Sequence, residues 1–262
     1  LIFLQPDLGT SLVLIFCFLV MLYWAQMPIE WILIFTCCLF TSLFSFTNSY
    51  ILIFWIPLMG FLAYKSFKAK NIATVLVVAF HGFIAQIAPF IWEYVLKGYQ
   101  KDRLILFLDP GRDPLGGGYH LLQSKIGIGS GGLFGTGLLK GKLTNLQFIP
   151  EQHTDFIFSA VGEEMGFVGS IFVVSLFLIL IILLLRIAKN ARTDFESLLV
   201  IGITSIFLFQ IIINIYMTIG LGPVTGIPLP FMSYGRTSLF VNFIFIGIAL
   251  STFKRSISLR KK

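Results

Sequence analysis

The sequence has little charge for its length. Only 12% of its 262 residues are Asp, Glu, Lys or Arg, about half the share in a typical soluble domain, while 57% are hydrophobic. Residues 31–64 contain no charged side chain at all. A single soluble domain does not need uncharged stretches of this length. The low charge therefore excludes an ordinary soluble domain and indicates a membrane protein.

Other missing features exclude further classes. The three cysteines lie in apolar runs and form no Cys-x-x-Cys pair, which argues against a disulfide framework and a zinc site. No G-x-x-x-x-G-K-[ST] motif occurs, so no nucleotide is expected as a cofactor. The net charge of +7 is scattered between hydrophobic runs, with no long basic run, so we expect no nucleic-acid partner.

The uncharged runs predict seven membrane-spanning helices, because a bilayer core of about 30 Å needs about 20 apolar residues per helix. These runs cover 8–26, 31–46, 50–64, 72–92, 165–185, 197–221 and 237–253. One helix over 31–64 would overshoot the membrane, so that stretch is split at Thr47-Asn48-Ser49; whether it crosses twice stays open. The predicted fold is an all-α polytopic membrane protein, a single integral membrane domain over residues 1–262.

The basic residues predict the orientation of these helices. With seven spans, the Lys and Arg of 65–70, 186–192 and 254–262 fall on one side, which the positive-inside rule makes cytoplasmic. The C-terminus is then cytoplasmic. Residues 5–10, the long loop 93–164 and the Pro/Gly-rich loop 222–236 fall on the outer side, the last as an outer-face or re-entrant loop.

The long loop 93–164 carries a helical pattern and a glycine cluster. The stretch "YHLLQSKIGIGSGG", residues 119–132, predicts a short amphipathic helix on the membrane surface, followed by a tight turn. Glycines around Ser130 can form an anion-binding nest of backbone N–H groups, with positive charge from Lys125. A loop this long is expected to be functional or to have structure of its own.

Ionisable residues gather at the end of this loop. Glu151, His153 and Asp155 lie within five residues, just before an apolar run. Thr154 or Asp155 can cap the following helix, or Asp155 can act as a general base or cation ligand beside its neighbours. Both interpretations stay open from the local sequence. Asp7, at the start of the first run, has the same alternatives, and Glu163 and Glu164 are expected in the first turn or at the interface.

Four long motifs occur together: "QPDLGTSLV", "DPLGGGYHLLQSKIGIGSGGLFGTG", "FIPEQHTDFIFSAVGEEMGFVG" and "PVTGIPLPFMSYG". With them the chain resembles the SEDS family (shape, elongation, division and sporulation), its RodA branch more than its FtsW branch. The family fold has about ten helices, so the resemblance implies that about three N-terminal helices are missing here. Arg236 stands where the family usually has a glycine, which affects the local turn.

The resemblance implies a peptidoglycan glycosyltransferase that polymerises lipid II into glycan strands for rod-shape elongation. It would act at the outer face of the bacterial cytoplasmic (inner) membrane, together with a class B penicillin-binding protein, and need no nucleotide. The alternatives are a lipid II flippase and a non-catalytic scaffold that activates a transpeptidase. A flippase is expected to show inverted repeats, and the sequence shows no internal repeat.

The resemblance also implies roles for individual residues. Asp155 is expected to be the general base of an inverting reaction and a ligand for Mg²⁺ or Mn²⁺. Arg103 and Lys125 are expected to contact the diphosphate of lipid II. The remaining predicted substrate-binding residues are Asp7, Ser130, Glu151, His153 and Thr154.

Overall fold

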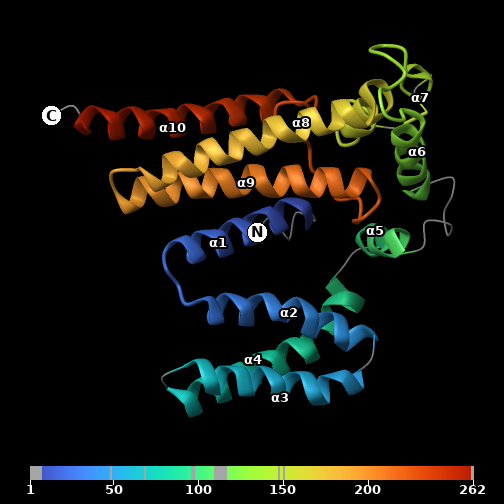
Figure 1. Cartoon of the computed structure of the whole chain (residues 1–262). Coiled ribbons are helices and arrows are strands. Elements are labelled where there is room, and N and C mark those ends of the chain that lie inside the picture. The colour runs from blue at the N-terminus through green and yellow to red at the C-terminus, as the bar shows by residue number, and fades with distance from the viewer. Residues whose placement is uncertain are drawn as a thin grey trace. The chain divides into compact units, whose positions relative to one another are not determined.

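The computed structural model describes residues 8–47, 49–67, 69–95, 98–108, 117–146, 148–149 and 151–260. Within these residues the regular secondary structure is helical. Seven apolar helices correspond to the seven predicted spans: α1 (Leu8–Trp24), α2 (Ile29–Thr47), α3 (Ser49–Ser66), α4 (Lys70–Phe90), α8 (Ile157–Lys189), α9 (Asp194–Thr218) and α10 (Arg236–Arg260) (Figure 1). The predicted all-α polytopic membrane fold is confirmed.

Five of these helices are long and apolar enough to cross a bilayer alone. They are α2, α4 with the π-helical turn η2 (Ile91–Val95), α8, α9 and α10, whereas α1 and α3 are shorter apolar helices. Residues 31–64 do form two helices, as predicted. Many large apolar side chains on these helices are exposed, which suits a surface that faces lipid rather than water.

The chain divides into two compact units, Leu1–Met21 with Asp102–Lys262, and Leu22–Lys101. In the second unit, α2, α3 and α4 pack on one another around a buried polar contact. The Thr41 hydroxyl lies 2.6 Å from His81 Nδ1 and accepts a hydrogen bond from Trp55 Nε1 at 2.9 Å. Hydrogen bonds of this kind hold helices together where lipid offers no polar partner.

The first unit is built on the antiparallel pair α8 and α9, which lie side by side (Figure 1). Buried side chains recur every three or four residues on both helices, and in the first half of α9 all residues from 200 to 205 are buried. The recurring residues are Val173, Phe177, Ile181 and Leu184 on α8, and Val200, Thr204, Phe207, Ile211, Asn214 and Thr218 on α9. On α1, Cys17 packs against α9, with its Sγ 3.5 Å from the Gly202 carbonyl oxygen.

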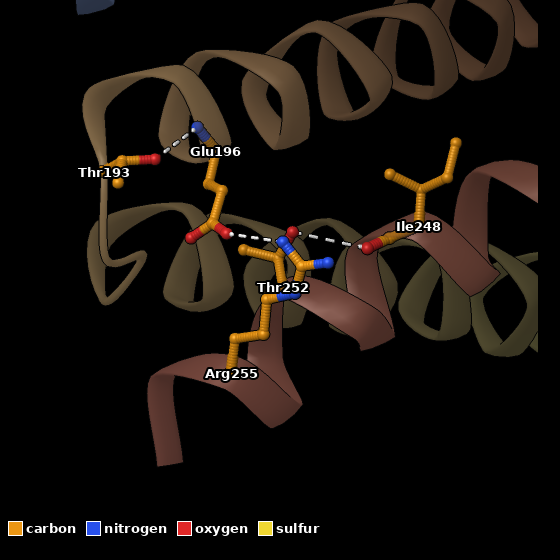
Figure 2. A network of polar contacts seen from close by, with 5 residues as sticks. All are labelled: Thr193, Glu196, Ile248, Thr252 and Arg255. Atoms are coloured by element: carbon orange, nitrogen blue, oxygen red, sulfur yellow. Dashed lines mark hydrogen bonds and ion pairs between the residues drawn. The ribbon is translucent and has the colours of Figure 1, made fainter. Parts of the chain in front are cut away.

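The turn between α8 and α9 lies at the same end of this unit as the C-terminal part of α10. Thr193 caps α9 by accepting a hydrogen bond from the Glu196 backbone N–H, and Arg255 on α10 pairs with the Glu196 carboxylate at 3.3 Å (Figure 2). The basic residues of 186–192 and Lys254 gather at this end. The start of α8, the end of α9 and the start of α10 lie at the opposite end.

The predicted long loop is largely helical. It contains α5 (Gly98–Leu108), α6 (Gly117–Ser130) and the single turn α7 (Lys142–Asn145), and α8 begins at Ile157, eight residues before the predicted span. The predicted amphipathic helix corresponds to α6. Its Leu121 and Ser124 are buried, and the Ser124 hydroxyl donates to the Thr218 carbonyl of α9 at 2.6 Å. One face of α6 therefore packs on the protein.

Candidate active site

A cleft of about 270 Å³ opens at the end of the first unit that lies away from the basic turn. Its walls come from α5, α6, the segment before α8 and the loop after α9. The lining residues are Arg103, Leu106, Phe107, His120, Leu121, Glu151, Asp155, Phe156 and Val224. Three of the predicted site residues, Arg103, Glu151 and Asp155, thus meet in one cleft although almost fifty residues separate Arg103 from Glu151.

The backbone of the segment 153–155 is tied to the irregular loop between α9 and α10. Tyr234 N–H donates to the His153 carbonyl at 2.7 Å, and the Ser233 hydroxyl donates to the Thr154 carbonyl at 2.6 Å. The same Ser233 oxygen accepts the Leu229 N–H at 2.7 Å. Because these bonds satisfy backbone groups, they fix the direction of the chain while leaving the Asp155 carboxylate at the cleft.

Asn214 on α9 completes this attachment. Its side-chain amide donates to the Asp155 carbonyl and to the Ile227 carbonyl, both at 2.8 Å, and the residue is fully buried. A single buried amide therefore joins the site segment to the Pro/Gly-rich loop. Loss of such a group would leave two carbonyl oxygens without a donor, at a cost of about 1–3 kcal/mol each.

The surroundings of Asp155 raise the pKa of its carboxyl above the usual value. Burial is the largest cause, and the negative charge of Glu151 adds to it, while the guanidinium of Arg103 acts in the opposite direction. A half-buried carboxylate of raised pKa is a better proton acceptor than an exposed one, and such groups are found at catalytic sites.

Gly226 lets the loop after α9 approach both charged groups. Its φ is +72°, a conformation that favours glycine, and a Cβ there would lie 3.3 Å from Asp155 Oδ2 and 3.9 Å from Arg103 Nη1. Arg103 Nη1 also donates to the neighbouring Thr225 carbonyl at 3.2 Å. The loop after α9 thus helps to hold the guanidinium beside the cleft.

The other predicted site residues lie outside the cleft lining. His153 is exposed, and the Thr154 hydroxyl donates to the Glu151 carboxylate at 2.9 Å. Lys125 is exposed on α6, and its side chain lies against Gly220 in the loop after α9. The Ser130 hydroxyl donates to the Gly127 carbonyl at 2.7 Å. Asp7 falls outside the described residues.

The capping interpretation of Thr154 and Asp155 is wrong. Phe156 occupies the N-cap position of α8, and no side chain caps this helix. The hydrogen bonds to the loop between α9 and α10 direct the preceding segment elsewhere, so neither side chain serves the helix terminus.

The first-turn prediction for Glu163 is also wrong, while its placement at the membrane interface stays a prediction. Glu163 lies in the second turn of α8 and is only 1% exposed. Its carboxylate accepts the backbone N–H groups of Leu143 and Thr144, at 2.8 and 2.9 Å, and the Thr144 hydroxyl. The buried carboxylate therefore holds α7 in place.

The sequence argument missed His120 and Asn214. The His120 ring stacks on Phe156, with centroids 6.1 Å apart, and lines the cleft. His120 precedes the buried Ser124 and Gly127 by four and seven residues, a helical spacing that places it on the packed face of α6. No comparable local signal marks Asn214.

Two carboxylates of the cleft are the candidates for a metal ion. Within the described part of the chain, no three His, Cys, Asp or Glu side chains gather as a ligand group. Asp155 and Glu151 both line the cleft. Mg²⁺ is often held by one or two carboxylates together with substrate phosphates, so this pair fits a cation that arrives with a phosphorylated substrate.

Comparison with known proteins identifies the family. The chain belongs to the FtsW/RodA/SpoVE family, whose model, described as "Cell cycle protein", matches residues 47–256. This family is the one that the sequence motifs resemble, so the predicted relationship is confirmed.

Individual relatives agree with this assignment. The chain is 43% identical over 191 residues to "Peptidoglycan glycosyltransferase MrdB" of Escherichia coli (strain K12), covering 73% of this chain and 50% of that protein. It is 36% identical over 286 residues to "Peptidoglycan glycosyltransferase RodA" of Treponema pallidum (strain Nichols), covering 96% and 64%. The chain thus spans about half to two thirds of these relatives.

A solved structure also resembles this fold. It is described as "Structural coordination of polymerization and crosslinking by a peptidoglycan synthase complex". The match has a TM-score of 0.59 and 28% sequence identity, and it covers 94% of this chain and 55% of that chain.

Proposed function

We propose that the protein, in its whole-length form, polymerises lipid II into the glycan strands of peptidoglycan during rod-shape elongation. The observation that carries this proposal is the cleft in which the Asp155 carboxylate, with its raised pKa, lies near the guanidinium of Arg103. The names of the relatives, peptidoglycan glycosyltransferases, support the same reaction.

The reaction joins two sugars by direct displacement. The acceptor hydroxyl gives its proton to the Asp155 carboxylate while its oxygen attacks the anomeric carbon of the donor. The bond from that carbon to the diphosphate breaks, and the lipid diphosphate leaves with the bonding electrons. Arg103 stabilises the negative charge that develops on the leaving group. A divalent cation bound by Asp155 and Glu151 would supply further positive charge there.

The location of the cleft supports a site on the extracytoplasmic side of the membrane. The basic residues of the turn between α8 and α9 and of the end of α10 lie at the opposite end of the unit, and the positive-inside rule assigns them to the cytoplasm. The cleft then opens on the extracytoplasmic side, and the C-terminus is cytoplasmic. The similarity to a chain of a peptidoglycan synthase complex supports a class B penicillin-binding protein as partner.

Polymerisation of labelled lipid II tests the proposal. The whole-length protein with its partner is compared with its Asp155→Asn variant, each with and without a chelator, and products are resolved on a gel. We expect glycan ladders from the wild type and a loss of about 10²–10⁴-fold in the variant, the usual contribution of a general base. Loss of wild-type polymerisation upon chelation would show that the reaction also requires a divalent cation.

The outcomes separate the three candidate functions. Full activity of a folded Asp155→Asn variant would contradict the assigned base. If neither protein makes polymer, lipid II movement across vesicle membranes would favour a flippase. Activation of the transpeptidase by both proteins, without polymer, would favour a scaffold.

A further inference from the structure

The loop between α6 and α7, together with the residue that follows α7, exposes large apolar side chains beside the cleft segment. Leu133, Phe134, Leu138, Leu139 and Leu146 are 63–82% exposed, and we call them the apolar loop surface. Exposed groups of this kind mark a contact with a membrane or another protein.

The backbone of this loop is held rigidly against α8. Thr136 N–H and Gly137 N–H donate to the carbonyls of Glu163 and Glu164, both at 3.0 Å. In return, Phe167 N–H and Val168 N–H donate to the loop carbonyls of Gly132 and Leu133, at 2.9 and 3.1 Å. These bonds hold the loop to α8 on both sides of its turn. Its apolar side chains are left exposed.

The kink of α8 makes this attachment sterically specific. Gly166 has a φ of +66°, and a Cβ there would collide with the backbone N of Gly135. The positive φ interrupts α8 and turns its backbone groups outward to bond the loop. The exposed leucines are thus part of a built structure.

The loop lies about one bilayer thickness from the basic end of α8. Arg186 follows Gly166 by 20 residues. At about 1.5 Å per residue this separation is about 30 Å, the thickness of the hydrocarbon core. With Arg186 at one interface, the loop that packs at Gly166 reaches the other interface.

The charges of the loop suit the same environment. Lys140 and Lys142 are exposed next to the apolar loop surface, and residues 117–150 contain no Asp or Glu. Basic side chains flanking apolar ones place ammonium groups among lipid phosphates while the apolar groups enter the acyl boundary.

We propose that the apolar loop surface inserts into the leaflet on the cleft side of the membrane and anchors the loop there, with Lys140 and Lys142 at the phosphate headgroups. The anchor would hold α7 and the following cleft segment at the depth where a lipid-linked substrate presents its headgroup. The inference rests on the fold alone and does not require the proposed glycosyltransferase activity.

Spin-label accessibility in lipid nanodiscs tests this proposal. Nitroxides are attached to single cysteines at Phe134 and Leu139 in the whole chain with its native cysteines replaced, in bilayers of zwitterionic and anionic phospholipid. Collision with oxygen, which concentrates in lipid, is compared with collision with a water-soluble nickel chelate. Leu178, exposed midway along α8, and Arg192, in the turn after α8, supply the lipid and water references.

We expect oxygen-to-nickel accessibility ratios at positions 134 and 139 several-fold above that at 192 and below that at 178. The adjacent position 140 should give a lower ratio than 139, because Lys140 lies at the headgroups. Ratios at 134 and 139 equal to that at 192 would overturn the proposal. Shielding from both reagents only after a protein partner is added would also overturn it, since a protein would then cover the surface.

Discussion

Two carboxylates eight residues apart are treated differently by the fold. The helical turn α7 gives the buried Glu163 carboxylate two backbone N–H groups and a hydroxyl as hydrogen-bond donors. The segment around Asp155 is bound through its backbone carbonyl by Asn214, and its carboxylate lines a cleft between Glu151 and Arg103. The first carboxylate is occupied by the protein, whereas the second is available to a substrate.

This difference separates stability from chemistry within one stretch of sequence. The Glu163 carboxylate already accepts three hydrogen bonds and is buried, so a substrate hydroxyl cannot reach it. A carboxylate whose position is fixed by the main chain keeps both oxygens for other partners. Substitutions at the two ends of this stretch should therefore have different consequences.

The largest effect on stability is expected for Glu163→Ala. The change leaves two backbone N–H groups of α7 without their acceptor, and hydrogen bonds to a charged group are worth about 1.5–3 kcal/mol each. Hydrogen exchange should speed up over residues 131–146 and the melting temperature should fall. Asp155→Ala is the matched control and should leave the hydrogen exchange and the melting temperature unchanged. Equal effects of the two variants would contradict the structural role of Glu163.

A smaller loss of stability, about 1–3 kcal/mol for each carbonyl left without a donor, is expected for Asn214→Ala. The substitution removes the donor to the Asp155 and Ile227 carbonyls, so the cleft segment and the loop after α9 should loosen together. The melting temperature and the polymerisation activity should both fall. Asn214→Leu keeps about the same size but cannot donate, so a fully stable Leu variant would show that these hydrogen bonds are unimportant.

The smallest expected effect is a shift in the pH dependence of polymerisation when a charged neighbour of Asp155 is replaced. The proposed mechanism requires the ionised Asp155, so activity should fall as the pH drops through the raised pKa of this group. Glu151→Gln removes a negative neighbour, lowers the pKa of Asp155 and moves the acidic limb to lower pH. Arg103→Met removes a positive neighbour, raises the pKa of Asp155 and moves the limb to higher pH. Shifts in the same direction would show that charge does not cause them.

The helices could be predicted from sequence because each has its own apolar run. Uncharged runs and length alone located the seven apolar helices of the described residues, including the division of residues 31–64. The first turns of α8 were missed because they contain acidic residues and lie before the kink at Gly166. The single-domain interpretation of residues 1–262 stays a prediction.

The site could be predicted only in part. Asp155 and Glu151 lie in one of the motifs, and Arg103 was predicted as a diphosphate contact; the structure places all three in one cleft. The bonds that fix Asp155 come from Asn214 and Ser233, which are 59 and 79 residues away from their partners in the chain, so no local pattern reveals them. The roles of Lys125, Ser130, His153 and Thr154 in substrate binding stay predictions.

The most direct test compares Asp155→Asn with Glu163→Gln in the whole-length protein, with lipid II polymerisation expressed per folded molecule and melting temperature measured on the same samples. We predict that Asp155→Asn melts like the wild type and makes almost no polymer, while Glu163→Gln melts at a lower temperature and its folded fraction still polymerises. Normal polymerisation by Asp155→Asn, or loss of activity in stable Glu163→Gln, would contradict the division between the two carboxylates.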